Sequence, residues 1–362
     1  MFMGQRRVRD GPRRRAPRPG ESRREYKGSL SLMSTNNVST RVAARASLLR
    51  GVRGFFDGRG FLEVDTPVLA RSLIPEPTID VFVTEAALAT PLYLVPSPER
   101  WMKRLVAAGC SAIYQIGHAF RNLEETGRWH ADEFAMLEWY TTGEDWAAAR
   151  RTTHQLLHAA STALAPWQGD HTRLCTFAGM EEPGALPEVR TVASLCQQAI
   201  GSPLVHLSLP ALQQVARGLG VDSSANDDWE QLFHRLFLTY VEPTIPDNRP
   251  VFVTEYPSSV PTLARTTPGT AVADRWELYL GGVEIANCFQ EEVNHQRLSA
   301  VFEGDAGRLR NSHTPRRVDW ELVERFSGSP LCTGVALGVD RLLAVMLGAP
   351  SLEEVAYCDT AS

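Results

Sequence analysis

The sequence predicts an α+β domain in which an antiparallel β-sheet is flanked by helices. Gly281 and Gly282 separate two strand-like segments, 275–280 and 283–290, a spacing typical of a two-residue hairpin. Two further strand-like segments flank the polar loop 122–130. Strands joined by hairpins, with helices set apart from them, are typical of this fold class.

The first elements are predicted from residue 41 onward. Apolar residues recur at helical spacing from Arg41 until Gly58 and Gly60. Segment 61–69 is predicted as a strand that is broken at Pro67. A second helix is then expected from its capping signal, with Ser97 as N-cap and Pro98 in the first position, and it should run to Gly109.

The remaining elements complete the sheet. Segments 112–121 and 132–142 are predicted strands. Residues 145–250 are mainly helical in pattern, which predicts an inserted subdomain. The glycine-spaced segment 334–341 predicts a strand that leads into the closing helix.

Composition narrows the class of protein. The chain has 362 residues, of which 43% are hydrophobic, enough for one large core or two small ones. No apolar run approaches the roughly 18 residues that a membrane span needs. The six cysteines include no Cys-x-x-Cys pair, which favours free thiols in a reducing cytoplasm.

Residues 1–38 are predicted to form a disordered basic tail ahead of a catalytic domain at 39–362. The first 35 residues carry a net charge of +7 and the whole chain −5, so the remainder carries −12. An acidic body is a poor general platform for nucleic acid, which rewards clustered Lys and Arg. Alternatively, translation begins at Met33 and part of the tail is a start-site artefact.

The strand at 132–142 presents polar residues on one face only. Side chains alternate along a strand, so one face carries Phe134, Met136, Glu138 and Tyr140, and the other carries Ala135, Leu137 and Trp139. The second set suits a core, and the first suits the floor of a site. The alternative for the first set is a solvent-exposed sheet face.

The hairpin brings two carboxylates together. With Gly281 and Gly282 as the turn, Tyr279 opposes Glu284 and Glu277 opposes Ala286. Glu277 and Glu284 then become diagonal neighbours on one face. Such a pair repels unless a cation lies between them, and oxygen ligands suit Mg²⁺.

Two further polar residues of the hairpin have the opposite parity. Asn287 and Glu291 can join the same site only if a bulge or a strand end follows Ile285. We therefore expect such an irregularity there. On the glycine-spaced strand, a ligand could approach closely, and Arg341 could stack over a purine.

From about Thr40 to the C-terminus, the chain resembles the catalytic domain of class II lysyl-tRNA synthetases. "GFLEVDTPVL" resembles motif 1, "FRN…EF" motif 2 and "GVDRL" motif 3 of that class. The resemblance implies an antiparallel catalytic sheet, a homodimer formed through motif 1, and ATP bound in a bent form with Mg²⁺.

The resemblance also implies roles for individual residues. Catalysis would rest on Arg121, Glu284 and Arg341, with Mg²⁺ held by Glu277 and Glu284. ATP would be bound by Arg121, Asn122, Glu124 (or Glu125), His130, Phe134, Glu284, Ile285, Gly338 and Arg341. The amino acid would be bound by Ser97, Glu99, Glu138, Tyr140, Asn287, Glu291 and Ala336. Within this set, Glu99 and Glu138 would take the backbone amine, and Tyr140 and Glu291 the side-chain ammonium.

Three departures from the family pattern stand out. The family's His-Asn-Pro-Glu-Phe becomes His-Ala-Asp-Glu-Phe at 130–134, which removes an Asn beside the adenine. The motif 2 loop is one residue longer. Cys288 replaces a usual Gly.

Part of the pattern resembles a truncated branch of this family. Lysyl-tRNA synthetases carry an anticodon-binding domain before motif 1, which begins here near residue 55. "YLVPSPERWMKRLVAAG", "MLEWY" and "GVALGVDRL" resemble the relatives that attach lysine or β-lysine to translation elongation factor P. Ala336, where the synthetases usually have Gly, adds a methyl group that favours a β-amino acid.

The resemblance therefore implies an ATP-dependent ligase. It would form a lysyl- or (R)-β-lysyl-adenylate and transfer the acyl group to a lysine of elongation factor P, without anticodon recognition and without a membrane. Two alternatives stay open. One is a stand-alone lysine-activating ligase whose acceptor is tRNA or a small amine. The other is a catalytically inactive paralogue with a binding or regulatory role.

Overall fold

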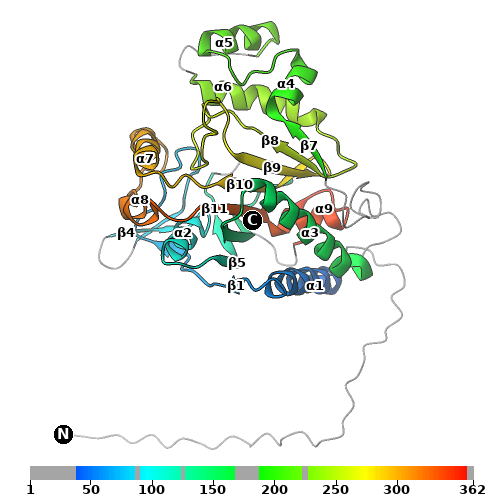
Figure 1. Ribbon diagram of the computed structural model, residues 1–362. Coiled ribbons are helices and arrows are strands. Elements are labelled where there is room, and N and C mark those ends of the chain that lie inside the picture. The colour runs from blue at the N-terminus through cyan, green and yellow to red at the C-terminus, as the bar shows by residue number, and fades with distance from the viewer. Residues whose placement is uncertain (1–37, 86–89, 124–126, 168–186, 222–226, 357–362) are drawn as a thin grey trace, which may run out of the picture.

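The computed structural model describes residues 38–85, 90–123, 127–167, 187–221 and 227–356 (Figure 1). The predicted basic tail, apart from Val38, lies outside the described residues, as do Glu124 and Glu125. None of the helices in the described part is long and apolar enough to cross a membrane.

An eight-stranded sheet forms the centre of the protein (Figure 1). In spatial order its strands are β1 (Leu62–Glu63), β5 (Ala112–Phe120), β6 (Glu133–Thr142), β11 (Cys332–Gly338), β10 (Val283–Gln290), β9 (Arg275–Leu280), β8 (Val251–Thr254) and β7 (Glu188–Thr191). The pairings from β5 to β8 are antiparallel, whereas the edge strands β1 and β7 pair in parallel with their neighbours. The predicted α+β class is confirmed.

Three helices cover one face of the sheet: α1 (Val38–Asp57), α3 (Trp146–Leu164) and α9 (Val339–Met346). Their apolar residues join the inward-facing residues of β6, β10 and β11 in the largest core. Phe56 of α1 stacks on Tyr114 of β5 with ring centroids 4.7 Å apart. The helical spacing that starts at Arg41 therefore reflects burial against the sheet.

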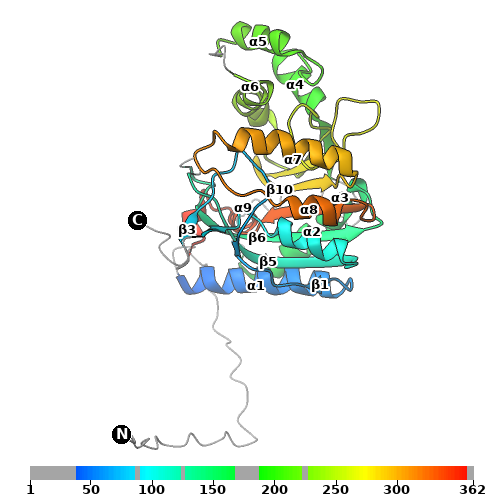
Figure 2. The ribbon, with the colours of Figure 1, turned by 90° about the vertical axis from the view of Figure 1, so that its left-hand side faces the viewer.

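The opposite face is covered by α2 (Glu99–Ala107), α7 (His295–Leu309) and α8 (Trp320–Phe326), which lie in front of the sheet in Figure 2. Met102, Phe302 and Phe326 from these helices pack with Ile113 and Tyr140 of the sheet. A small sheet adjoins this layer, in the order β2 (Leu69–Ala70), β4 (Pro91–Leu94) and β3 (Val83–Glu85).

A separate helical cluster lies beyond β7 and β8 (Figure 1). It contains α4 (Val192–Ile200), α5 (Leu209–Gly218), α6 (Trp229–Leu236), η3 (Phe237–Val241) and η4 (Glu242–Thr244). Leu195, Leu212 and Phe233 pack there against Val251 and Tyr279 of the sheet. Within 145–250, α3 and β7 instead belong to the central sheet and its cover, with η1 (Ala165–Trp167) after α3. A last short helix, η5 (Leu352–Glu354), follows α9.

Two predicted elements differ in detail. Segment 61–69 is not one strand: its first residues pair with β5, and its end pairs with β4 of the small sheet. The chain changes sheets between them at Pro67, which cannot donate to a ladder. The predicted helix with Ser97 as N-cap begins one residue later than expected, at Glu99, with Pro98 in the N-cap position and no side-chain capping bond.

Candidate active site

A cleft of about 370 Å³ opens on the α2 side of the central strands. Its walls come from β6, β10 and β11, the start of α2 and α9, and the loop around Glu76. The loop at 129–131, which links β5 to β6, closes one end.

Most of the predicted site residues line this cleft. They are Ser97, Glu99, Arg121, His130, Phe134, Glu138, Tyr140, Glu284, Ile285, Asn287, Glu291, Ala336, Gly338 and Arg341. Two predicted residues are not among the described residues that line it. Asn122 lies on the neighbouring chain segment, where its N–H donates to Asp80, and Glu277 lies behind Glu284.

The parity prediction for β6 is confirmed. Phe134 and Glu138 line the cleft together with Met136 and Tyr140, whereas the alternate residues Ala135, Leu137 and Trp139 are buried in the core on the α1 side. Successive side chains of β6 therefore point alternately to the cleft and to the core.

A β-bulge in β10 brings further residues to the cleft. Tyr279 opposes Glu284 as predicted, but the register shifts before Ala286, so Glu277 opposes Asn287. The predicted pairing of Glu277 with Ala286 is therefore wrong, because the strand gains one residue at Ile285. The bulge itself was expected there, and it turns both Asn287 and Glu291 toward the cleft.

One end of the cleft combines cations with an aromatic ring. The guanidinium of Arg121 lies 5.3 Å from the centre of the Phe134 ring. Arg341 donates from Nε to the carbonyl of Trp129 at 2.9 Å and from Nη1 to the carbonyl of Glu284 at 3.1 Å. An aromatic face beside two guanidinium groups suits a purine and its phosphates.

The carboxylate of Glu284 faces this end. Burial, and then the charge of Glu277, raise the pKa of Glu284 to about 7. Glu277 is already engaged by Arg275 at 2.5 Å, by Tyr256, and by Tyr279 at 3.1 Å. A divalent cation would relieve the repulsion between the two carboxylates. Glu284 therefore fits as a Mg²⁺ ligand. Glu277 could bind the ion only through an oxygen lone pair that does not already accept from Arg275 or the two tyrosines.

The other end of the cleft is acidic. Glu99, Glu138 and Glu291 meet there, and a buried lysine, Lys103, lies behind them. The Nζ atom of Lys103 is 2.7 Å from Glu99 Oε1 and 2.7 Å from Glu291 Oε2. Burial alone would lower the pKa of Lys103, but Glu291 and Glu99 outweigh it and raise that pKa.

Two of the carboxylates at this end, Glu138 and Glu291, are hard to ionise. Burial raises the pKa of Glu291 to about 7, although the charge of Lys103 opposes the shift. Burial, and then Glu99, raise the pKa of Glu138 well above its ordinary value. A ligand that brings positive charge would reverse these shifts, since an opposite charge favours the ionised form.

Apart from the two oxygens that are paired with Lys103, two buried acceptors among the described residues of the cleft have no hydrogen-bond partner. They are Oε2 of Glu138 and Oδ1 of Asn287. Both side chains line the cleft from adjacent positions on β6 and β10, either side of Ala336 on β11. Buried acceptors without donors are costly unless a ligand supplies them. This end of the cleft therefore suits a ligand rich in N–H donors.

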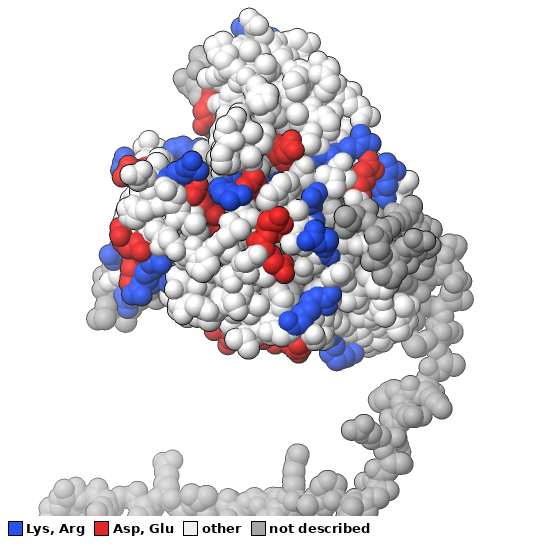
Figure 3. All heavy atoms as spheres, viewed as in Figure 1, with Lys and Arg blue, Asp and Glu red and all other residues white. Residues whose placement is uncertain are grey.

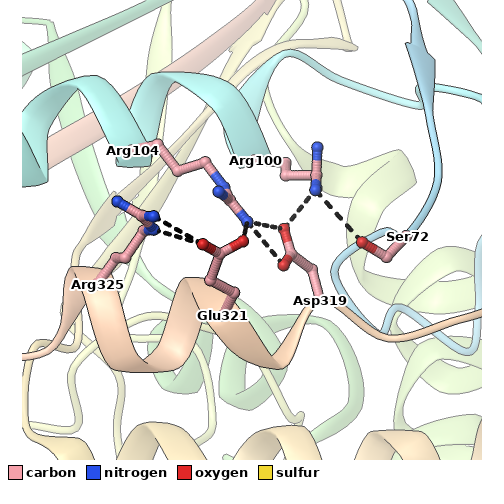
Figure 4. A network of polar contacts seen from close by, with 6 residues as sticks. All are labelled: Ser72, Arg100, Arg104, Asp319, Glu321 and Arg325. Atoms are coloured by element: carbon pink, nitrogen blue, oxygen red, sulfur yellow. Dashed lines mark hydrogen bonds and ion pairs between the residues drawn. The ribbon is translucent and has the colours of Figure 1, made fainter.

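Helix α2, which carries Glu99 and Lys103, is fixed from its outer side (Figure 4). The side chains of Arg100 and Arg104 both reach Asp319, at 2.5 and 2.8 Å. Asp319 is itself buried and immediately precedes α8. Charge-assisted bonds of this kind hold α2 against α8, so the helix presents its acidic end to the cleft in a set position.

Glu76 and Lys103 were not expected from the sequence as site residues, and Gly334 was expected to allow the close approach of a ligand, not of Glu291. Glu76 lines the cleft, and burial, then Glu99, raise its pKa to about 7. Gly334 lies where a Cβ atom would be 2.6 Å from Glu291 Oε1. Lys103 could have been found as an i,i+4 partner of Glu99 on a helix, but its contact with Glu291 joins distant parts of the chain.

The fold and the cleft define a class II synthetase core, and comparison with known proteins agrees. Residues 21–358 match the family described as tRNA synthetases class II (D, K and N), and the chain belongs to this family. The similar curated proteins have a narrower description. One from Vibrio vulnificus, named elongation factor P--(R)-beta-lysine ligase, is 38% identical over 86% of this chain and 93% of its own length.

Other relatives carry the same name. The Vibrio cholerae protein is 37% identical over 89% of this chain and 96% of its own length. The Histophilus somni protein is 36% identical over 87% of this chain and 93% of its own length. The chain therefore spans nearly the whole of the relatives that it matches.

Proposed function

We propose that this protein activates a diamino acid, lysine or (R)-β-lysine, with ATP and transfers the acyl group to a lysine side chain of translation elongation factor P. The observation that carries the first part is the acidic end of the cleft. Three carboxylates and two unpartnered acceptors meet there, a few residues along the same strands from the aromatic and cationic end. A substrate with two ammonium groups and one carboxylate matches this distribution of charge.

In the proposed reaction, the amino acid's carboxylate attacks the α-phosphate of ATP. The bond to the β-phosphate breaks, so pyrophosphate leaves and an aminoacyl-adenylate remains. Arg121 would neutralise charge on the α-phosphate, and Arg341 would hold the adenine against Phe134. Glu284 would hold Mg²⁺, which when bound would neutralise negative charge on the phosphates. Such catalysis rests on positioning and electrostatics.

In the second step, the neutral amine of the acceptor lysine attacks the carbonyl carbon of the adenylate. An amide forms and AMP leaves. The relatives named as ligases of (R)-β-lysine to elongation factor P support this acceptor and this amino acid. Ala336 supports a β-amino acid, since it lies between Glu138 and Asn287 on adjacent strands and narrows the space beside them.

We also propose that the protein is a homodimer that works in the cytoplasm. Leu62, Val68 and Leu69 of the motif 1 segment are exposed, and apolar exposure of this kind is typical of a covered interface. The thiols of Cys110, Cys196, Cys288 and Cys332 are free, as expected in a reducing compartment.

A general nucleic-acid platform finds little support on the face shown in Figure 3. Basic and acidic side chains lie intermixed across its middle, and the described residues of that face form no single basic patch. Phosphate backbones reward clustered positive charge.

The test combines two measurements. ATP–pyrophosphate exchange with a panel of amino acids, without tRNA, should respond to lysine or β-lysine. Intact-mass spectrometry of elongation factor P from the same organism should then show the addition of one lysyl or β-lysyl group. Aminoacylation of tRNA without modification of the factor would favour a tRNA acceptor. A lack of exchange with every amino acid of the panel would favour an inactive paralogue.

A further inference from the structure

Lys103 occupies an unusual place for a lysine. Its side chain is 1% exposed, and its Nζ atom lies 5.3 Å from the centre of the Phe326 ring. An ammonium group so far from water is costly unless it is paired. Here both of its short contacts are with carboxylates of the amino-acid end of the cleft, Glu99 and Glu291.

The two carboxylates come from different elements and would have different tasks. Glu99 begins α2, whereas Glu291 follows the end of β10. Each contacts Lys103 through one oxygen at 2.7 Å, so these two oxygens are at most about 5.4 Å apart. The ammonium therefore sets the spacing between α2 and the end of β10 at the point where the substrate's two amines would bind.

The remaining oxygen of Glu291 points to the cleft floor. Its Oε1 lies at Gly334, next to the ring of Tyr140. Because Oε2 is held by Lys103, the carboxylate cannot rotate without breaking an ion pair. The contact thus orients the acceptor that a substrate ammonium would meet.

Charge supports the same conclusion. When a substrate with two ammonium groups brings all three carboxylates into their charged form, the ammonium of Lys103 leaves two negative charges, which balance the two ammonium groups. Without Lys103 there would be three negative charges for the two ammonium groups to balance.

We propose that Lys103 is the positioning residue for diamino-acid recognition: it joins the carboxylate for one amine to the carboxylate for the other, and keeps the two at a fixed spacing. The inference rests on the proposed function for the identity of the ligand. It rests on the structure for the coupling of the two carboxylates.

The groups that face this cluster from the elements around it must be counted in any titration. They are Glu76 from the loop before β3, Glu138 and Tyr140 from β6, Cys288 from β10 and Cys332 from β11. Glu76 and Glu138 add negative charge when ionised, so they strengthen the need for Lys103. The two thiols, whose pKa values are raised by burial, stay neutral below pH 9.

The experiment compares Lys103→Met with Arg325→Met, which removes an exposed cation of α8 that contacts Glu321. In pyrophosphate exchange at pH 7, Lys103→Met should raise the KM for the diamino acid at least tenfold and leave the KM for ATP within about twofold. The loss should shrink as pH rises toward 9, because Glu291 then ionises without help. Arg325→Met should change neither KM by more than about twofold at any pH.

A second measurement does not depend on activity. The buried carboxyls have folded-state pKa values above their unfolded values, so the native state binds more protons and loses stability as pH rises to the folded pKa. In the wild type the part of this loss that comes from Glu291 should end near pH 7, which is the pKa of that group. In Lys103→Met the pKa is higher, so urea midpoints should keep falling between pH 7 and 9. Arg325→Met should change the midpoint little at any pH.

These results separate the two proposals. If the wild type shows no exchange with any amino acid, the proposed function is rejected. The urea midpoints still test the coupling of Glu99 and Glu291 through Lys103. A Lys103→Met midpoint that falls equally at every pH overturns the role proposed for Lys103, as does an unchanged amino-acid KM. If Lys103→Met does not fold, Lys103→Met/Glu291→Gln should, because it removes one uncompensated charge. A double variant that also fails to fold would show that Lys103 is needed for its shape, against the proposal.

Discussion

Gly334 and Glu291 approach each other so closely that a Cβ atom on Gly334 would lie 2.6 Å from Oε1 of the glutamate. The same atom would lie 2.6 Å from Cε1 of Tyr140. Glycine is thus required at position 334, because the side chains of Glu291 and Tyr140 leave no room for a Cβ atom. Any larger residue there should displace one of these two side chains.

Gly334→Ala should weaken binding of the diamino acid by about 1–3 kcal/mol, the usual cost of overpacking. The methyl group must displace Glu291 or Tyr140, while the ATP end of the cleft is untouched. The measurement is the KM for each substrate in pyrophosphate exchange. Gly54→Ala is a suitable control, since no atom lies within 4 Å of its added Cβ on α1, and it should be neutral or slightly stabilising. An unchanged amino-acid KM in Gly334→Ala would show that Glu291 does not bind the substrate.

Glu291→Gln should raise the KM for the diamino acid far more than the KM for ATP. Removing one partner of a buried charge pair costs about 2–5 kcal/mol. Isothermal titration with each substrate separately can measure both affinities. Equal losses for ATP and for the amino acid would place the role of Glu291 elsewhere.

Amino-acid binding should depend on pH near neutrality. The pKa of Glu291 is about 7, and its ionised form is the one that attracts an ammonium group. The affinity should therefore rise as pH increases from 6 to 8, by roughly tenfold, since the ionised fraction grows from about one tenth to about nine tenths. The amine of the lysine side chain, with a pKa of about 10.4, stays charged over this range. Glu291→Gln should flatten this part of the profile, and a wild-type affinity that is constant from pH 6 to 8 would contradict the assignment.

Asp319→Asn should lower the free energy of unfolding by about 3 kcal/mol, because it removes one charge of a buried ion pair and leaves Arg100 unpaired in the interior. Urea denaturation followed by fluorescence can measure the change. Glu321→Gln, at the exposed end of the same network in Figure 4, should change the stability little. Similar losses for the two variants would mean that burial of Asp319 does not matter.

Local sequence patterns predicted much of the site, and long-range contacts account for most of the rest. The hairpin at Gly281–Gly282 and the two faces of β6 follow from residue spacing, which is a local property. The bulge at Ile285 was expected only on the condition that Asn287 and Glu291 belong to the site. The pairing of Lys103 with Glu291 could not be predicted in this way, because it joins residues that are far apart in the chain. Glu76 sits between two prolines, where no periodic pattern indicates which way a side chain points.

The bulge in β10 makes the length of this strand as important as its composition. Before the bulge, Glu284 faces the cleft; after it, Asn287 and Glu291 do, while Cys288 packs into the core on the α3 side. Deleting Ile285 would remove the extra residue and restore a regular pleat, and the pairings beyond it could stay in place. Deleting one residue after the bulge, such as Cys288, would instead exchange the two faces downstream. Glu291 would then take the place of Gln290, which is buried and accepts from the N–H of Trp146 at the start of α3. Deletion of Cys288 should therefore abolish substrate recognition, whereas deletion of Ile285 should disturb it less.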